Sequence, residues 1–172
     1  MKILAIDPGF ERLGIAILEK NKGDQKECVV YSDCFHTSKN LPMSERLLLV
    51  GEKVRRVIKK YKPEALAIET LFMQNNQKTV MPVAESRGVV IYEASRAGLR
   101  VFEYGPQQIK IAVAGHGRAE KRQVMDMVRK LVEMNPVRGR EGSQRPSASN
   151  GTDDELDAVA CGLTFFATEK IR

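Results

Sequence analysis

The sequence predicts an α/β fold in which a five-stranded mixed sheet is flanked by helices. Its 172 residues, 42% of them hydrophobic, suffice for one substantial core and are too few for two. Three apolar runs of strand length follow one another closely near the N-terminus, which favours an antiparallel meander. Further along, strand-length runs alternate with longer segments of helical periodicity, which favours parallel strands. We therefore expect residues 1–172 to form a single domain.

The first part of the chain supplies three strands and one helix. The turn DPGFER and a polar loop join the strands. The segment MSERLLLVGEKVRRVIKKY has its apolar residues at helical spacing and is followed closely by Pro63, which stops a helix. The expected elements are strands 2–7, 13–19 and 28–36 and a helix at 43–61.

The remaining elements alternate between strands and helices. Gly98 is expected to close one helix and Pro106 to open the next. Residues 135–151 are rich in Arg, Gly, Ser and Pro and lack apolar periodicity, so we expect a mobile basic loop there. The expected elements are strand 65–69, helix 80–97, strand 99–104, and helices at 106–114, 118–133 and 153–169.

Composition excludes some classes of protein. No stretch approaches the roughly 20 apolar residues that cross a bilayer, and the N-terminus opens into a strand instead of a signal sequence. We expect a cytoplasmic protein with no membrane partner. The three cysteines, Cys28, Cys34 and Cys161, show no CxxC spacing, which argues against a disulfide framework and a structural zinc site. We expect them as reduced thiols.

Positive charge is concentrated in the last third of the chain. The formal net charge is +6, and between Lys110 and Arg145 there are nine basic residues against four acidic ones. Such a concentration indicates a polyanionic partner such as nucleic acid. A solvated helix face that happens to be basic would give the same count, so charge alone leaves both readings open.

Four carboxylates stand where a purely structural role explains them poorly. Asp7 ends one apolar run and Glu69 ends another, so two core strands each deliver an acid at the edge of the sheet. Asp154 and Asp157 are three residues apart and fall on one face of the last helix. Singly, these acids could be a turn residue, a loop cap and complements to the helix dipole. If all four acids had only these structural roles, several independent coincidences would be needed to explain their positions.

The neighbouring acids of the last helix have simpler explanations. Thr152 and Glu155 fit a capping box, which is a sufficient structural reason for Glu155. Asp153 is also one turn from Asp157 and could replace Asp154 in the set. We prefer Asp154, because Asp153 shares a helix face with Leu156 and is expected to point toward the core.

An all-oxygen set of ligands, without His or Cys, suits Mg²⁺ or Mn²⁺ rather than zinc. Metal ions in such sites work in pairs about 4 Å apart during phosphoryl transfer. Beside a basic surface, this set indicates a metal-dependent nuclease. A metal would also offset the charge of Asp7, which is costly to bury unpaired.

Four blocks of sequence together resemble the RuvC family of Holliday junction resolvases, within the RNase H-like superfamily. The blocks are ILAIDPGFERLGIAIL, AIETLFMQNNQKTVMPVAESRGVV, YGPQQIKIAVAGHGRAEKRQV and DDELDAVACGL, in this order. The resemblance implies an RNase H-like fold and a Mg²⁺-dependent crossover junction endodeoxyribonuclease that acts in recombination and DNA repair. It also implies a homodimer that nicks a four-way junction symmetrically, with the branch-migration proteins RuvA and RuvB as partners. The helix around 80–97 is the expected dimer contact on this resemblance.

The resemblance also assigns roles to individual residues. The acids that match the family's two-metal active site are Asp7, Glu69, Asp154 and Asp157. Lys110, Lys121 and Arg122 match phosphate contacts, and Phe72 matches the side chain that pushes against bases at the crossover. Each has an alternative: Phe72 could fill the core, and the basic side chains could be solvated or lie along apolar surface.

The chain departs from the family pattern at two places. His116 stands in AGHGRA where a lysine is expected, so one positive charge is missing at neutral pH. The segment 135–151 is longer than usual, and its arginines could either contact the DNA backbone or only solvate the loop.

Two other functional classes fit parts of the sequence. The DPGFERLG turn resembles the phosphate-binding hairpin of the actin and sugar-kinase fold, but that fold needs a second domain for which 172 residues leave no room. A non-catalytic or RNA-directed RNase H-like module would bind structured nucleic acid. Such a module would not need Glu69 together with both helix acids.

Overall fold

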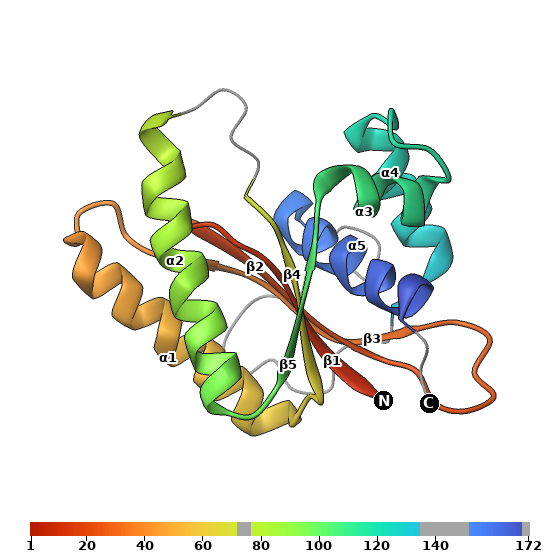
Figure 1. Cartoon of the computed structure of the whole chain (residues 1–172), viewed down its shortest axis with the longest axis horizontal. Helices are drawn as coiled ribbons and strands as arrows, with labels where there is room; N and C mark the ends of the chain where they lie inside the picture. The colour runs from red at the N-terminus through yellow and green to blue at the C-terminus, as the bar shows by residue number, and fades with distance from the viewer. Residues whose placement is uncertain (72–76, 135–151, 170–172) are drawn as a thin grey trace.

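The two faces of the central sheet are both apolar. Strands β1 (Lys2–Asp7) and β2 (Arg12–Glu19) turn alternate side chains to opposite faces, and nearly all of these side chains are buried. Ile3 belongs to one hydrophobic cluster and Leu4 to the other. A sheet that is apolar on both faces must be covered on both. The computed structural model has this three-layer α/β/α arrangement (Figure 1). It describes residues 1–71, 77–134 and 152–169.

The sheet has the mixed topology that the sequence predicts. The strand order is β5-β4-β1-β2-β3-β6 in the described residues, with β1–β2 and β2–β3 antiparallel and β1–β4 and β4–β5 parallel. The first five strands lie within one residue of their predicted bounds. A sixth, two-residue strand pairs parallel with β3 and was not predicted. The remaining strands are β3 (Cys28–His36), β4 (Ala65–Glu69), β5 (Arg100–Tyr104) and β6 (Glu133–Met134).

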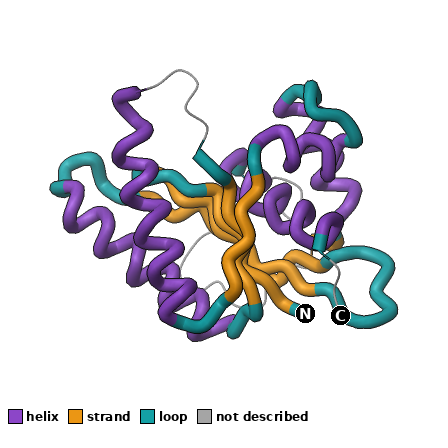
Figure 2. The backbone as a smooth tube through the Cα atoms, viewed as in Figure 1, coloured by secondary structure: helices purple, strands orange, loops and turns teal. Residues whose placement is uncertain are grey.

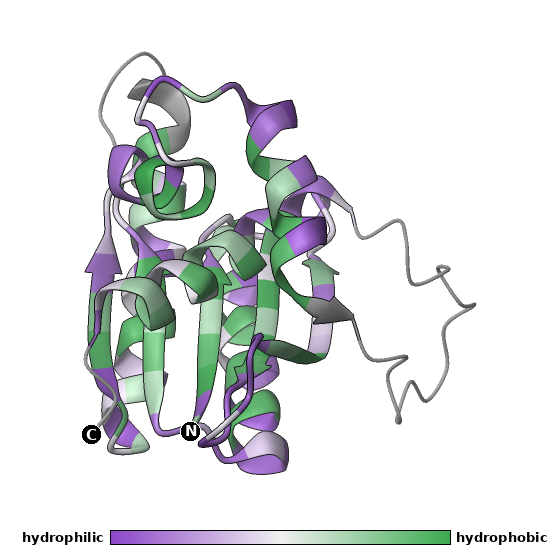
Figure 3. Cartoon of the chain, turned by 90° about the vertical axis from the view of Figure 1, so that its right-hand side faces the viewer, coloured by the Kyte–Doolittle hydropathy of each residue, from purple (hydrophilic) through white to green (hydrophobic). Residues whose placement is uncertain are grey.

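Two helices cover one face of the sheet and three cover the other (Figures 1 and 2). The first layer is α1 (Met43–Tyr61) and α2 (Gln77–Arg96), and the second is α3 (Pro106–Ala114), α4 (Lys121–Leu131) and α5 (Asp153–Thr168). Figure 3 shows hydrophobic residues along the strands and on the helix surfaces that face them. Within the described residues, no helix has the length and apolar character needed to span a membrane.

The helix predicted over 118–133 is wrong at both ends. Helix α4 begins after Glu120, whose extended backbone caps it, and it ends before Val132, which is also extended. Val132 leads directly into β6. A two-residue strand is too short to show a period of its own, and the apolar Val132 before it fits the helical period of the preceding segment.

Helix α5 lies unusually close to β1 and β2. A Cβ atom at Gly162 would stand 2.5 Å from Leu18 Cδ1 and 3.1 Å from Ala5 Cβ. At the start of the helix, a Cβ atom at Gly14 would stand 2.1 Å from the carbonyl oxygen of Asp154. Glycine at these two positions therefore lets the helix lie directly on the sheet, with its first turns over the ends of β1 and β2.

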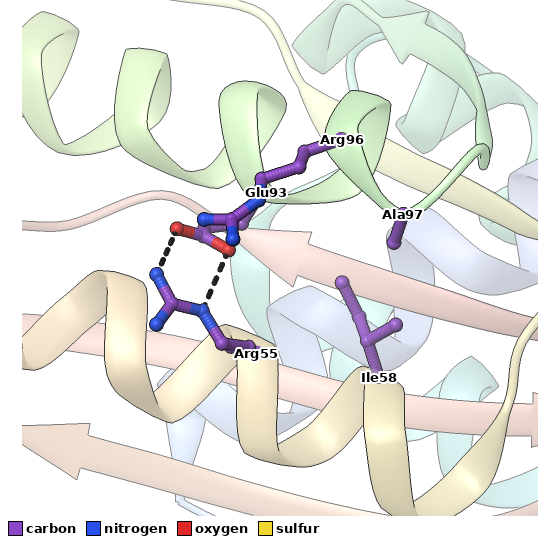
Figure 4. Close-up of a pocket in the computed structure, with 5 residues that line it drawn as sticks. All are labelled: Arg55, Ile58, Glu93, Arg96 and Ala97. Carbon is purple, nitrogen blue, oxygen red and sulfur yellow. Dashed lines mark hydrogen bonds and ion pairs between the residues drawn. The ribbon is translucent and has the colours of Figure 1, made fainter.

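On the other face, an ion pair between the exposed Arg55 and the buried Glu93 joins α1 to α2. The Arg55 guanidinium donates through Nε and Nη2 to the two carboxylate oxygens of Glu93, at 3.0 and 2.7 Å. Figure 4 shows this pair beside a shallow pocket that Ile58, Arg96 and Ala97 also line. The hydrogen bond from Arg55 lowers the pKa of Glu93. This pocket contains none of the predicted catalytic or DNA-contacting residues.

Candidate active site

Asp7 and Glu69 come from the ends of neighbouring parallel strands. Strands β1 and β4 pair in the register Ile6 with Ile68, so the next residue of each strand reaches the same edge of the sheet. Both acids are half-buried. On its other side Asp7 pairs with Gly14, the glycine that contacts the start of α5.

The start of α5 is fixed by the cap that the sequence predicts. The Thr152 hydroxyl accepts a hydrogen bond from the Glu155 backbone N–H at 3.4 Å. The buried Glu155 carboxylate accepts from Ser32 Oγ at 2.6 Å, which ties the first turn of the helix to β3. Glu155 is therefore structural, as expected, and the cap holds the neighbouring acids in place.

The expected orientation of Asp153 is wrong. Its side chain is exposed and lies 3.5 Å from the Lys121 ammonium instead of pointing toward the core. The first residue of a helix has no preceding turn to shield it, so sharing a face with Leu156 does not bury it. Asp154 is half-buried, lies 3.7 Å from Arg12 Nη1 and accepts from Cys34 Sγ at 3.5 Å.

The four predicted acids act on one another electrostatically. Burial, followed by the charges of Glu69, Asp157 and Asp154, raises the pKa of Asp7 to about 8. Burial and the charge of Asp157 raise the pKa of Glu69 to about 7. Two strand ends and one helix thus deliver carboxylates to a common region, in which the charges of Glu69, Asp154 and Asp157 disfavour the ionisation of Asp7.

One lysine partly offsets this negative charge. Lys121 Nζ lies 3.1 Å from Asp157 Oδ2, and its charge lowers the pKa of both Asp7 and Glu69. Burial nevertheless keeps the pKa of Asp157 above its ordinary value. Burial lowers the pKa of Lys121 itself, but its hydrogen bond to Asp157 and the nearby acids raise it overall.

The donor set fits a hard divalent cation, although the acids do not form a closed ligand cage. Across the described ranges, no group of three or more His, Cys, Asp and Glu side chains has the mutual placement of a metal-binding cluster. All four predicted ligands are carboxylates, the ligand type that Mg²⁺ and Mn²⁺ favour. The raised pKa values of Asp7 and Glu69 indicate excess negative charge that a bound cation would relieve.

The other predicted contacts either make no described pairing with this cluster or lie outside the described residues. Lys110 is half-buried on α3 and Arg122 is exposed on α4, and neither pairs with one of the four acids in the described contacts. His116 is exposed between these helices. Phe72 and the segment 135–151 lie outside the described residues.

Sequence reasoning missed two neighbours of Asp154, which are Cys34 and Arg12. Gly14 pairs with both Asp7 and Cys34, so Asp7, Gly14 and Cys34 stand side by side across three strands. Burial and the charge of Asp154 raise the pKa of Cys34 to about 12, which keeps the thiol protonated as a donor. Arg12, at the start of β2, is the other missed neighbour. Only the pairing register of the first three strands could have indicated either residue.

Comparisons with known proteins agree with this arrangement. The family model for crossover junction endodeoxyribonuclease RuvC matches residues 3–141. The protein of that name from Desulfitobacterium hafniense is 42% identical over 163 residues, which cover 95% of this chain and 90% of the relative.

Solved structures give the same result. The Thermus thermophilus RuvC structure matches with 32% identity and a TM-score of 0.79 over 97% of this chain and 94% of the other. T. thermophilus RuvC in complex with Holliday junction substrate matches with the same identity and TM-score over 96% and 93% of the two chains. The predicted RNase H-like fold is confirmed, and this chain belongs to the RuvC family of crossover junction endodeoxyribonucleases.

Proposed function

We propose that this chain is a nuclease that resolves four-way (Holliday) DNA junctions by paired symmetric nicks, in recombination and DNA repair. Membership of the RuvC family supports this function, as does the match to a relative solved with Holliday junction substrate. The observation that carries the proposal is the convergence of Asp7, Glu69, Asp154 and Asp157 in one electrostatically coupled region.

The family implies use of a divalent metal, and we propose Mg²⁺, with Mn²⁺ as a substitute. Two ions per site would be held by Asp7, Glu69, Asp154 and Asp157. When bound, such ions lower the pKa of an attacking water and neutralise charge on the phosphate and the leaving oxygen. The chain contributes rigid placement, because two of the acids end core strands and two stand on a capped helix that lies directly on the sheet.

The proposed DNA contacts differ in how well the structure supports them. Lys121 is best placed, because its ammonium already lies beside Asp157 and can turn to a phosphate oxygen near the acids. Lys110 and Arg122 remain proposed phosphate contacts on neighbouring helices of the same layer. The role of Phe72 at the crossover rests on the resemblance alone.

Paired nicks require two active sites, so we propose a homodimer that associates through α2. This helix exposes Met81 and Tyr92, at 66% and 62% of their surface, and space is open around Gly88 between them. Their spacing of three helical turns puts them on one side of the helix, where a two-fold axis would match the surface to itself. RuvA and RuvB are proposed partners on the resemblance alone.

A cleavage assay on defined substrates tests the proposed function. We expect the chain to cut a four-way junction in Mg²⁺, leaving 5′-phosphate and 3′-hydroxyl ends, and to leave plain duplex intact. Asp7→Asn should abolish cutting while junction binding persists. Preferred cutting of an RNA–DNA hybrid would instead favour the RNA-directed alternative, and loss of binding together with cutting would argue against a metal role for Asp7.

A further inference from the structure

Two consecutive residues of α2 hold the main chain beside both strand-end acids. Ser86 is fully buried, and its hydroxyl donates to the carbonyl oxygen of Gly9 at 2.9 Å. Gly9 lies two residues after Asp7, in the turn between β1 and β2. Arg87 Nε donates to the carbonyl oxygen of Glu69 itself at 3.2 Å. One helix therefore contacts the backbone at the ends of β1 and β4.

The Arg87 side chain is itself held in place. Its Nη2 pairs with the carboxylate of Glu103 on β5, and only 17% of the Arg87 side chain is exposed. Because Nε bonds to the main-chain oxygen of Glu69, the carboxylate of Glu69 stays available for other ligands. The guanidinium thus ties α2 to two adjacent parallel strands without neutralising the acid that one of them carries.

The turn after Asp7 has a second anchor, from α1. The buried Arg46 donates through Nε to Thr37 Oγ1 at 2.9 Å and through Nη2 to the carbonyl oxygen of Phe10 at 3.2 Å. The Thr37 hydroxyl donates to the same carbonyl at 2.6 Å. Helix α1 holds Phe10 and helix α2 holds Gly9, so the turn has little freedom to move. The position of Asp7 therefore depends on the contacts that these two helices make with the turn.

We propose that Ser86 and Arg87 are positioning residues for the nuclease reaction, because they set the relative positions of the Asp7 and Glu69 carboxylates through the backbone. This inference rests on the proposed function. Shared metal ligation requires placement within about 0.5 Å, and a shift of about 1 Å can cost roughly 100-fold in rate.

The test compares Arg87→Ala and Ser86→Ala with the control Arg56→Ala. Arg56 is an exposed arginine of α1 that bonds only to the Glu52 carbonyl in the described contacts, so its variant loses the same charge away from the site. We expect single-turnover junction cleavage by Arg87→Ala to fall about 10- to 100-fold, and that by Ser86→Ala about 10-fold. Both should need more Mg²⁺ for half-maximal rate and show a smaller Mg²⁺-induced rise in unfolding temperature. Metal-free junction affinity should stay within twofold of the control.

Glu103→Gln separates positioning from direct contact with DNA. Glu103 is half exposed, so this variant should fold, and it keeps every basic side chain. If Arg87 positions the backbone, Glu103→Gln should also slow cleavage and raise the Mg²⁺ requirement. If Arg87 instead binds phosphate, freeing it should leave cleavage intact, and Arg87→Ala should lose junction affinity.

The inference is overturned if the Arg87 and Ser86 variants cut with wild-type rate and Mg²⁺ dependence, or if lost affinity accounts for the whole effect. Wild-type protein that does not cut a junction would reject the proposed function and this inference with it. A wild-type protein that cuts while the variants are unaffected would reject this inference alone.

Discussion

At the scale of single residues, the raised pKa values of Asp7 and Glu69 indicate that the metal-free site has too little positive charge to balance its carboxylates. Their values of about 8 and about 7 compare with 3.8 and 4.5 for the same groups in water. The folded chain therefore binds more protons than the unfolded chain between about pH 4 and pH 8. The resulting stability is fully present below about pH 4, falls progressively as the pH rises, and is fully lost once the pH passes the folded-state pKa values of about 7 and about 8.

Metal-free protein should accordingly lose thermal stability from pH 5 to pH 8.5. Asp7→Asn removes one of the charges that cause this loss, so we expect the variant to gain stability relative to wild type by up to about 4 kcal/mol between pH 5 and pH 8.5. Thermal unfolding in a chelator measures both. A variant that is less stable than wild type at pH 8.5 would show that neighbouring groups stabilise the charged Asp7 carboxylate in the folded protein.

Lys121 and Arg122 are adjacent basic residues with different surroundings, and this difference gives a second prediction. Either alanine variant should reduce the salt dependence of junction binding by about one unit of slope if its residue contacts phosphate. Only Lys121→Ala should also move the pH–rate profile to higher pH, because the Lys121 charge lowers the pKa of Asp7 and Glu69. Equal pH profiles for the two variants would contradict the arrangement around Lys121.

At the scale of secondary-structure elements, the site depends on how closely α5 lies on the sheet. The Cβ atom of Gly14→Ala would meet the Asp154 carbonyl at 2.1 Å, so the helix start must move away. We expect a loss of about 1–3 kcal/mol in the free energy of unfolding and a larger loss of cutting than of junction binding. Chemical denaturation and cleavage assays measure the two effects.

Gly88→Ala is the matched control for stability, since its Cβ atom would meet nothing within 4 Å. Alanine in a helix is favoured over glycine by up to about 1 kcal/mol, so this variant should be as stable as wild type or slightly more so. If Gly14→Ala were equally well tolerated, close packing of α5 would not be what fixes Asp154.

Most of the fold was predictable from local pattern, as was the placement of the four acids at two strand ends and on the last helix, while their role as metal ligands stays a prediction. The exceptions share a cause. Period-two and helical patterns located every long element, and strand ends together with helix spacing identified the acids. Strand β6 was not predicted, because two residues are too few to show a periodic pattern. Asp153 was misplaced because helical periodicity ignores the exposure of a first turn. The neighbours of the acids, such as Cys34 and Ser86, could not be predicted, because they meet the site only through strand register and helix packing.

At the scale of the whole molecule, the proposed active site and the proposed dimer contact lie on opposite faces of the sheet. The layer of α3, α4 and α5 carries the helix acids and the proposed phosphate contacts, while α1 and α2 lie on the other face (Figure 1). An exposed apolar residue on each layer therefore allows a matched comparison: Met81 on α2 and Ile111 on α3, at 66% and 55% exposure.

Met81→Arg should convert the proposed dimer to monomer, because a charge repeated across a two-fold contact faces its own copy. Ile111→Arg should leave the oligomeric state unchanged. Analytical ultracentrifugation distinguishes the two, and the monomeric variant should release singly nicked junctions where wild type makes both cuts. Dimers of undiminished affinity in Met81→Arg would place the contact elsewhere.

We propose that four acids from distant parts of the chain share bound divalent metal. Anomalous diffraction from crystals soaked in Mn²⁺ tests this proposal. We predict density within coordinating distance of carboxylate oxygens from Asp7, Glu69 and the start of α5, and no such density in Asp7→Asn. Manganese bound elsewhere, with these carboxylates still apart and individually hydrogen-bonded, would contradict the account.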